Sequence, residues 1–169
     1  AKKREDWKAL ATFYKYLGKG YQKKGFYDKS LEAYQQELNT REKLDDDIRL
    51  LETKRKIALF SLAEGDIEEA MSYCQKGLSI AIENKDEIGE ATFLKSIGYI
   101  YALQNQCDTA LTYYQQVITK TERLKLNVLA AITFFGIGDC LEKLGQLDSA
   151  AIYLNRAFPY AENSNFTSL

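Results

Sequence analysis

Residues 94–101 read Leu-Lys-Ser-Ile-Gly-Tyr-Ile-Tyr, and within them Leu94, Ile97, Gly98 and Tyr101 lie at i, i+3, i+4 and i+7. Positions with this spacing share one face of a helix that has 3.6 residues per turn. The stretch therefore predicts an amphipathic α-helix with an apolar stripe and a small residue in the middle of that stripe.

The same pattern recurs every 40 residues along the chain, and we call positions separated by 40 or its multiples equivalent. Each copy continues through a turn residue into a second apolar stripe. Asparagine, which follows glycine in its tolerance of positive φ, suits one of these turns. A fixed period of this kind predicts stacked helical hairpins. The equivalent apolar-small pairs are Leu17-Gly18, Ile57-Ala58, Ile97-Gly98 and Ile137-Gly138, and the turn residues are Gly25, Gly65, Asn105 and Gly145.

The small positions predict close approach between the two helices of each hairpin. Gly18, Gly98 and Gly138 let the second helix approach the first closely. We expect large residues of the second helix to fill the space beside its own small residues, with Tyr34, Tyr114 and Leu154 beside Ser30, Ala110 and Ala150. The second copy departs from the pattern, because Lys54 and Ser61 stand where the stripe expects large apolar residues. This predicts either a looser second hairpin or a lysine redirected to the surface.

These residues resemble the motif of the tetratricopeptide repeat family, in Tyr14-x-x-Leu17-Gly18-x-x-Tyr21 and in Phe134-x-x-Ile137-Gly138-x-x-Leu141. The 40-residue period is similar to that of a longer-repeat subclass, which includes Leu-Gly-Asn-repeat adaptors, kinesin light chains and bacterial peptide-sensing regulators. The resemblance implies an all-α fold, an α-solenoid in which four helix-turn-helix units form a right-handed superhelix. Joints without proline suggest that helices extend continuously between pairs.

We expect a single array over residues 1–169. The register places a truncated further helix at its C-terminal end, and ends that lack a capping helix offer contacts for oligomers. The expected repeats are approximately 5–41, 44–82, 86–122 and 126–161, with 163–169 as the start of the further helix.

The resemblance also implies a concave groove lined by the first helix of each unit, in which a partner binds. Basic side chains near one end would meet an acidic segment of that partner, and aromatic side chains would make apolar contacts. The alternative, that these lysines form only a solvated helix face, remains open. The candidate groove residues are Lys15, Tyr16, Lys19, Arg55, Lys56, Lys95, Tyr99, Phe135 and Asp139.

We interpret the chain as a protein-protein interaction module that binds a peptide or partner segment, as a scaffold. The alternative is a peptide-sensing or regulatory domain of a bacterial signalling or transcription-control protein. The sequence has no histidine, no Gly-rich phosphate loop and no G-x-S-x-G elbow, so we expect neither catalysis nor a cofactor. We expect no metal either, because the run Asp45-Asp46-Asp47 suits a helix cap better than a ligand loop.

Composition limits the partners further. With 23 basic and 24 acidic residues, no overall field favours nucleic acid. No run approaches the roughly 20 apolar residues of a membrane span, so direct membrane insertion is not expected.

The three cysteines, Cys74, Cys107 and Cys140, form no C-x-x-C pair. We read them as small core residues in a reducing compartment, which favours a cytoplasmic location, with the periplasmic portion of a membrane-anchored sensor as the alternative. The repeated Tyr73, Tyr113 and Tyr153 are expected to pack between neighbouring repeats rather than to stack on nucleic acid bases.

Overall fold

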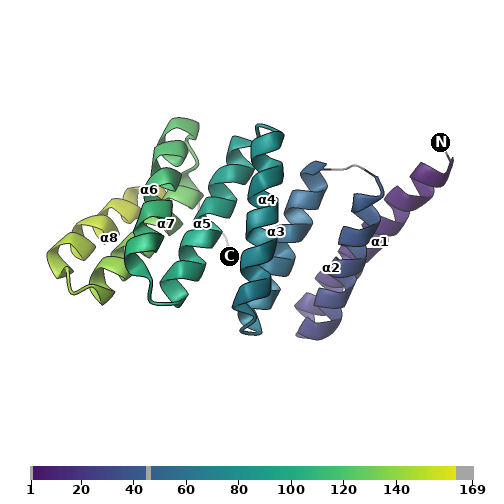
Figure 1. Ribbon diagram of the computed structural model, residues 1–169, viewed down its shortest axis with the longest axis horizontal. Helices are drawn as coiled ribbons and strands as arrows, with labels where there is room; N and C mark the ends of the chain where they lie inside the picture. The colour runs from purple at the N-terminus through teal and green to yellow at the C-terminus, as the bar shows by residue number, and fades with distance from the viewer. Residues whose placement is uncertain (1, 45–46, 163–169) are drawn as a thin grey trace. The chain divides into compact units, whose positions relative to one another are not determined.

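The computed structural model describes residues 2–44 and 47–162, which form eight helices and contain no strand. Figure 1 shows each odd-numbered helix beside the even-numbered helix that follows it. The predicted all-α fold of helical hairpins is confirmed. The helices are α1 (Lys2–Lys23), α2 (Tyr27–Glu42), α3 (Asp47–Ala63), α4 (Ile67–Glu83), α5 (Glu87–Leu103), α6 (Cys107–Leu124), α7 (Asn127–Lys143) and α8 (Leu147–Glu162).

The turn inside each hairpin is made by the residue that the repeat predicts. Gly25, Gly65 and Gly145 have φ values of 76°, 84° and 75°, and Asn105 has a φ of 59°. L-residues with a Cβ rarely adopt this left-handed conformation, whereas glycine does so without cost and asparagine with little. The predicted turn chemistry is therefore confirmed at all four positions.

The joints between hairpins differ from the expectation. Helix α4 ends at Glu83 and α6 ends at Leu124, and left-handed residues follow at Lys85 (φ 55°) and Lys125 (φ 56°). A residue with positive φ cannot continue a right-handed helix. The expectation of continuous helix extension is therefore wrong at these two joints. Asp45 and Asp46, in the joint between α2 and α3, lie outside the described residues, as do residues 163–169 and the further helix expected there.

The chain divides into two compact units, Ala1–Asn84 and Lys85–Leu169. In the first unit α2 packs against both α1 and α3, and in the second unit α6 packs against both α5 and α7. Each unit therefore contains two hairpins joined through the second helix of the earlier hairpin. The predicted repeat boundaries and the handedness of a superhelix stay predictions.

The small residues of the repeat bring the paired helices together as expected. A Cβ added at Gly18 would lie 2.7 Å from Cε1 of Tyr34, and one added at Gly98 would lie 2.9 Å from Cε1 of Tyr114. A Cβ at Gly138 would lie 2.7 Å from Cδ2 of Leu154. Carbon atoms do not approach this closely without displacement. Glycine at these positions is thus required by the packing of a large side chain from the second helix.

The second hairpin accommodates its polar residues internally. The Lys54 side chain is buried, with Nζ 3.6 Å from Oε1 of Glu42, and the buried Ser61 hydroxyl donates a hydrogen bond of 2.6 Å to Oε2 of Glu69. The expected redirection of Lys54 to the surface is therefore wrong, because a carboxylate from α2 neutralises it in place. The three cysteines are buried and free, as predicted. Among the described residues, no helix has the length and apolar character needed to span a membrane.

Candidate partner-binding surface

The nine predicted groove residues fall into two sets, one in each unit. Five of them lie on α1 and α3 of the first unit, and four lie on α5 and α7 of the second. Each set has its own geometry. The first set is Lys15, Tyr16, Lys19, Arg55 and Lys56, and the second is Lys95, Tyr99, Phe135 and Asp139.

Glu52 organises the first set, because its carboxylate pairs with two of the predicted lysines. Nζ of Lys15, on α1, lies 3.2 Å from Oε2 of Glu52, and Nζ of Lys56, one turn along α3, lies 3.0 Å from Oε1. This bridge joins α1 to α3. Together with Lys19 of α1 and Arg55 of α3, these side chains make up a set that we call the basic cluster: Lys15, Lys19, Arg55, Lys56 and Glu52.

The electrostatics of the basic cluster follow from partial burial beside opposite charges. Burial raises the pKa of Glu52, but hydrogen bonds and charges from Lys56 and Lys15 outweigh this effect and lower the pKa to about 2. Burial lowers the pKa of Lys56, and the neighbouring Glu52 carboxylate offsets part of the shift. Glu52 is therefore ionised at neutral pH and partly neutralises the cluster. The sequence interpretation placed the cations here but did not identify Glu52 as their shared partner.

A pocket of about 300 Å³ lies beside Lys56. Nζ of Lys56 lies over the ring of the buried Tyr34, 5.0 Å from its centroid. Lys56 therefore contacts the core on one side and lines the pocket on the other. Tyr27 and Leu59 are exposed at the pocket. A cation and apolar side chains are thus adjacent on one surface. The lining residues are Gln22, Tyr27, Lys56, Leu59, Phe60 and Ala63.

The second set is aromatic rather than basic. Tyr99 on α5 and Phe135 on α7 are exposed, and the two helices contact each other. Lys95 is half-buried. Asp139 forms an ion pair with Lys143, with Oδ2 2.9 Å from Nζ, so its charge is locally compensated. This part of the predicted site offers apolar contact area more than charge.

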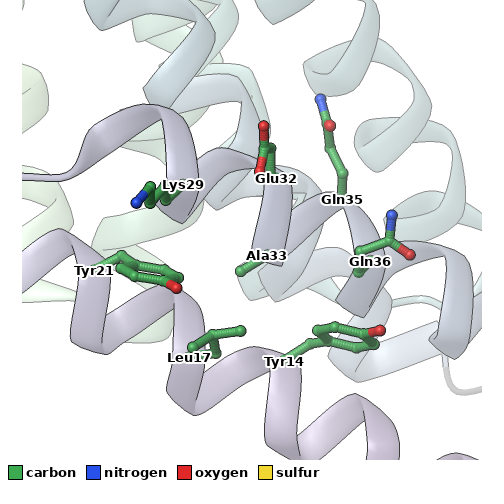
Figure 2. A pocket seen from close by; sticks show the side chains of 8 residues that line it. All are labelled: Tyr14, Leu17, Tyr21, Lys29, Glu32, Ala33, Gln35 and Gln36. Carbon is green, nitrogen blue, oxygen red and sulfur yellow. The ribbon is translucent and has the colours of Figure 1, made fainter.

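A second hollow, of about 380 Å³, lies between α1 and α2 and was not predicted. In Figure 2, Tyr14, Leu17 and Tyr21 from α1 face Ala33 from α2 across it. The signal was present in the repeat, since Ala33 is equivalent to the three tyrosines of the other copies, Tyr73, Tyr113 and Tyr153. Tyr113 stacks on Tyr101 of its own hairpin with a centroid distance of 5.5 Å, and not on a neighbouring repeat as predicted, whereas Tyr73 and Tyr153 pack against the cores of their units.

Two family models described as tetratricopeptide repeat match the chain, at residues 49–123 and 131–163. Among curated proteins, none is significantly similar in sequence. Solved structures share the fold, including aspartyl phosphate phosphatase F from Bacillus subtilis, with a TM-score of 0.83 and 24% identity over 92% of this chain. A Rap protein complexed with competence and sporulation factor gives a TM-score of 0.81 with 20% identity over 93% of the chain.

A putative kinesin light chain repeat protein from Podosopora anserina is also similar, with a TM-score of 0.69, 15% identity and coverage of 92% of this chain and 77% of that one. The chain spans 41% of the phosphatase structure and 44% of the Rap protein. At these identities the similarity shows the fold alone.

Proposed function

We propose, from the premise that this chain belongs to the tetratricopeptide repeat family, that it is a protein-interaction module that holds an acidic peptide or partner segment against α1 and α3. The observation that carries this proposal is the basic cluster. Two of its four cations, Lys15 and Lys56, share the Glu52 carboxylate, so the surface keeps an excess of positive charge in a chain whose total charge is close to zero. A local excess of this kind attracts a complementary acidic segment.

The two cations that take no part in the Glu52 bridge are the strongest candidates for direct contact with a ligand. Lys19 is exposed and Arg55 is half-exposed, and within the described residues neither forms an ion pair with a carboxylate. Arg55 also offers the planar fork that binds a carboxylate through two hydrogen bonds. An acidic ligand would compete with Glu52 for Lys15 and Lys56, whose ammonium groups are already in place.

The pocket beside Lys56 supports a ligand that combines acidic and apolar side chains. Its volume of about 300 Å³ accommodates a large apolar side chain, and Leu59, Phe60 and Tyr27 supply the apolar walls. Exposed apolar side chains gain most from burial at a partner interface. A peptide in which a leucine or phenylalanine lies beside aspartate or glutamate therefore suits this surface. Tyr99 and Phe135 provide separate apolar contact area in the other unit.

A regulatory role is the second candidate. Similar structures include a Rap protein complexed with competence and sporulation factor and a Rap conjugation gene regulator in complex with the Phr* peptide. A peptide-sensing domain would use the same basic cluster as a scaffold would. One similar structure is named a phosphatase, and for this chain the absence of catalysis stays a prediction, as does the cytoplasmic location.

The proposal is tested by measuring peptide binding with fluorescence anisotropy, using synthetic peptides in which aspartate and glutamate flank one phenylalanine. An uncharged control peptide has glutamine in place of each acidic residue. The double variant Lys15→Glu/Arg55→Glu is expected to weaken binding of the acidic peptide at least tenfold and to reduce its dependence on salt concentration. Glu52→Gln, which releases Lys15 and Lys56, is expected to strengthen it.

The matched control is Lys24→Glu/Lys76→Glu, which changes net charge equally at exposed positions of the same unit. This control is expected to bind like the wild type. Equal affinities of the wild type and the Lys15→Glu/Arg55→Glu variant for the acidic peptide would refute the proposal. So would equal affinities of the wild type for the acidic and the glutamine peptides.

A further inference from the structure

Helix α8 exposes apolar side chains at positions that are buried in α2 and α6. Phe158 is 64% exposed, whereas the equivalent Leu38 of α2 and Ile118 of α6 are 5% and 4% exposed. Leu154 is half-exposed, whereas Tyr34 and Tyr114 are buried. The reason is that α3 packs on α2 and α7 packs on α6, while among the described residues no helix follows α8. The exposed face of α8 is thus the face that α2 and α6 present to the next hairpin.

The hollow between α1 and α2 is the other half of the same kind of interface. In the first unit α2 covers the face of the α3–α4 hairpin, and in the second unit α6 covers the face of the α7–α8 hairpin. Leu17, at the hollow, is partly exposed, whereas its equivalents Ile57 and Ile137 are buried. Each unit therefore builds this helix-on-hairpin interface once, and within the described residues the outer face of α8 and the hollow between α1 and α2 lack the equivalent cover.

The two open halves are complementary in size. Ile118 and Tyr153 belong to one apolar cluster, and Leu38 and Tyr73 belong to another. At the open halves, the larger Phe158 replaces Ile118 and the much smaller Ala33 replaces Tyr153. A ring added on one side is thus matched by a ring removed on the other, which close packing requires.

A second pair of positions shows the same exchange. The ring of Tyr114 lies against Gly136 of the following helix, where an added Cβ would be 2.9 Å from Cζ. At the open halves, the smaller Leu154 replaces Tyr114, and the exposed Tyr16 replaces Gly136. The first exchange lowers the combined side-chain volume at its contact and the second raises it, so the two changes offset each other across the interface.

Polar groups at the rim also find counterparts. Oε1 of Glu122 lies 3.4 Å from an Arg156 guanidinium nitrogen across the α6–α8 contact. The positions equivalent to these two residues at the open halves are Glu162 and Gln36. Gln36 lines the hollow, and its side-chain amide can donate to the Glu162 carboxylate. The open rim therefore carries an acceptor and a donor rather than two like charges.

We propose that α8 of one copy docks on the α1–α2 hollow of a second copy, so that the chain self-associates head to tail. Phe158 enters the hollow over Ala33, and Leu154 packs against Tyr16. The contact is heterologous, so an open complex of these chains keeps one unused α8 face and one unused hollow. This proposal uses the hollow and α8 and does not depend on peptide binding at the basic cluster.

Sedimentation velocity of the 169-residue chain from about 1 μM to 1 mM tests the proposal, over a range that spans weak and moderate dissociation constants. The wild type is expected to sediment faster as concentration rises. Phe158→Asp is expected to raise the dissociation constant at least tenfold. Ile152→Asp is the matched control, because Ile152 is exposed on α8 but its equivalent Thr112 stays exposed on α6. A monomeric wild type at every concentration would overturn the proposal, as would equal effects of the two aspartates.

Two further variants keep the test independent of any effect of Phe158→Asp on folding. Ala33→Tyr fills the hollow with the side chain that the other three copies carry at this position, and it is expected to weaken association. Ala33→Tyr mixed with Phe158→Asp is expected to yield a one-to-one dimer and nothing larger, since each variant keeps one intact half. The double variant Ala33→Tyr/Phe158→Ile places at the two open halves the same side chains that Tyr153 and Ile118 provide inside the second unit. It is expected to recover association. Failure of both the mixture and the double variant would overturn the head-to-tail geometry.

Discussion

The two units have the same helical hairpins but differ in the residues that fill the interface between the two hairpins inside each unit. In the second unit the α6–α7 interface is apolar, with Val117 and Phe134 buried. In the first unit the equivalent positions hold Glu37 and Lys54, which are also buried. The repeat therefore specifies a backbone geometry that tolerates either an apolar or a charged interior.

The difference shows how a binding surface can be built into a repeat. Buried charges require partners, and the partners in the first unit are other side chains of the same interface, such as Arg41 for Glu37 and Glu52 for Lys56. Extending that network to the surface produces the basic cluster. The apolar interface of the second unit contributes burial of hydrocarbon instead. We therefore expect the second unit to be the more stable one and the first to be more sensitive to charge.

The largest expected effect is the loss of Phe134, whose fully buried ring packs against Tyr153 and Tyr160. Phe134→Ala is expected to lower the free energy of unfolding of the second unit by about 3–5 kcal/mol, because it removes buried surface and leaves a cavity. Hydrogen exchange in α7 and α8 measures the loss. The equivalent change in the first unit, Lys54→Ala, is expected to cost far less, because it removes a charge whose burial is itself unfavourable. Equal losses at both positions would contradict the comparison.

The next-largest expected effect is a loss of stability when the buried ion pair of the first unit is broken. A guanidinium nitrogen of Arg41 lies 2.6 Å from Oε1 of Glu37, and both side chains are buried. Arg41→Met leaves the Glu37 carboxylate buried without its cation and is expected to cost about 3 kcal/mol.

The double variant Glu37→Val/Arg41→Met removes both charges and imitates Val117 of the second unit. It is expected to regain most of the stability lost by the single variant. Urea unfolding followed by the fluorescence of Trp7, the single tryptophan, reports on this unit. A double variant no more stable than Arg41→Met would show that the charges themselves are needed for folding.

The features that the sequence predicted correctly are local or periodic. A turn with positive φ needs only one residue of the right type, as at Gly145. The close approach of the two helices of a hairpin needs only a repeated glycine, as at Gly18 and Gly138. The hairpins follow from the spacing of apolar residues within each helix. These features do not depend on which side chains from distant parts of the sequence lie in contact with them.

The features that the sequence did not predict depend on such distant side chains. Lys15 lies 37 residues from Glu52, and nothing in either helix alone indicates that the two pair. The burial of Lys54 depends in the same way on Glu42 of the preceding helix. The hollow at Ala33 could have been predicted, because the repeat shows that a tyrosine is missing there, but its shape requires the positions of both helices.

A smaller effect is expected from adding a methyl group at helix glycines. Gly138→Ala in the second unit is expected to cost about 1–3 kcal/mol, because the new Cβ would lie 2.7 Å from Leu154. Gly20→Ala in the first unit has open space around it and is expected to stabilise α1 by about 0.5–1 kcal/mol through its better helix propensity. Thermal unfolding of the two variants measures the loss of stability in Gly138→Ala and the gain in Gly20→Ala. Loss of stability in Gly20→Ala would contradict the assignment of that glycine to an unconstrained position.

The smallest expected effect is the acid-dependent loss of the Glu52 bridge in the first unit, which has no counterpart at the equivalent position of the second unit. The pKa of Glu52 is lowered from its ordinary value of 4.5 to about 2, so its contribution to stability is fully present above pH 4.5 and is lost as the pH falls toward 2. After allowance for solvent screening of this partly exposed group, we expect a contribution on the order of 1 kcal/mol. The equivalent residue of the second unit is Ile132, which does not titrate.

Glu52→Gln separates this effect from the titration of other carboxylates. The variant is expected to be less stable than the wild type at pH 6 and to approach it at pH 2, where protonated Glu52 no longer attracts Lys15 and Lys56. Urea unfolding at both pH values, followed by Trp7 fluorescence, measures the convergence. A constant difference between the variant and the wild type at the two pH values would mean that the Glu52 side chain stabilises α3 by packing, and that the ion bridge between α1 and α3 contributes nothing measurable.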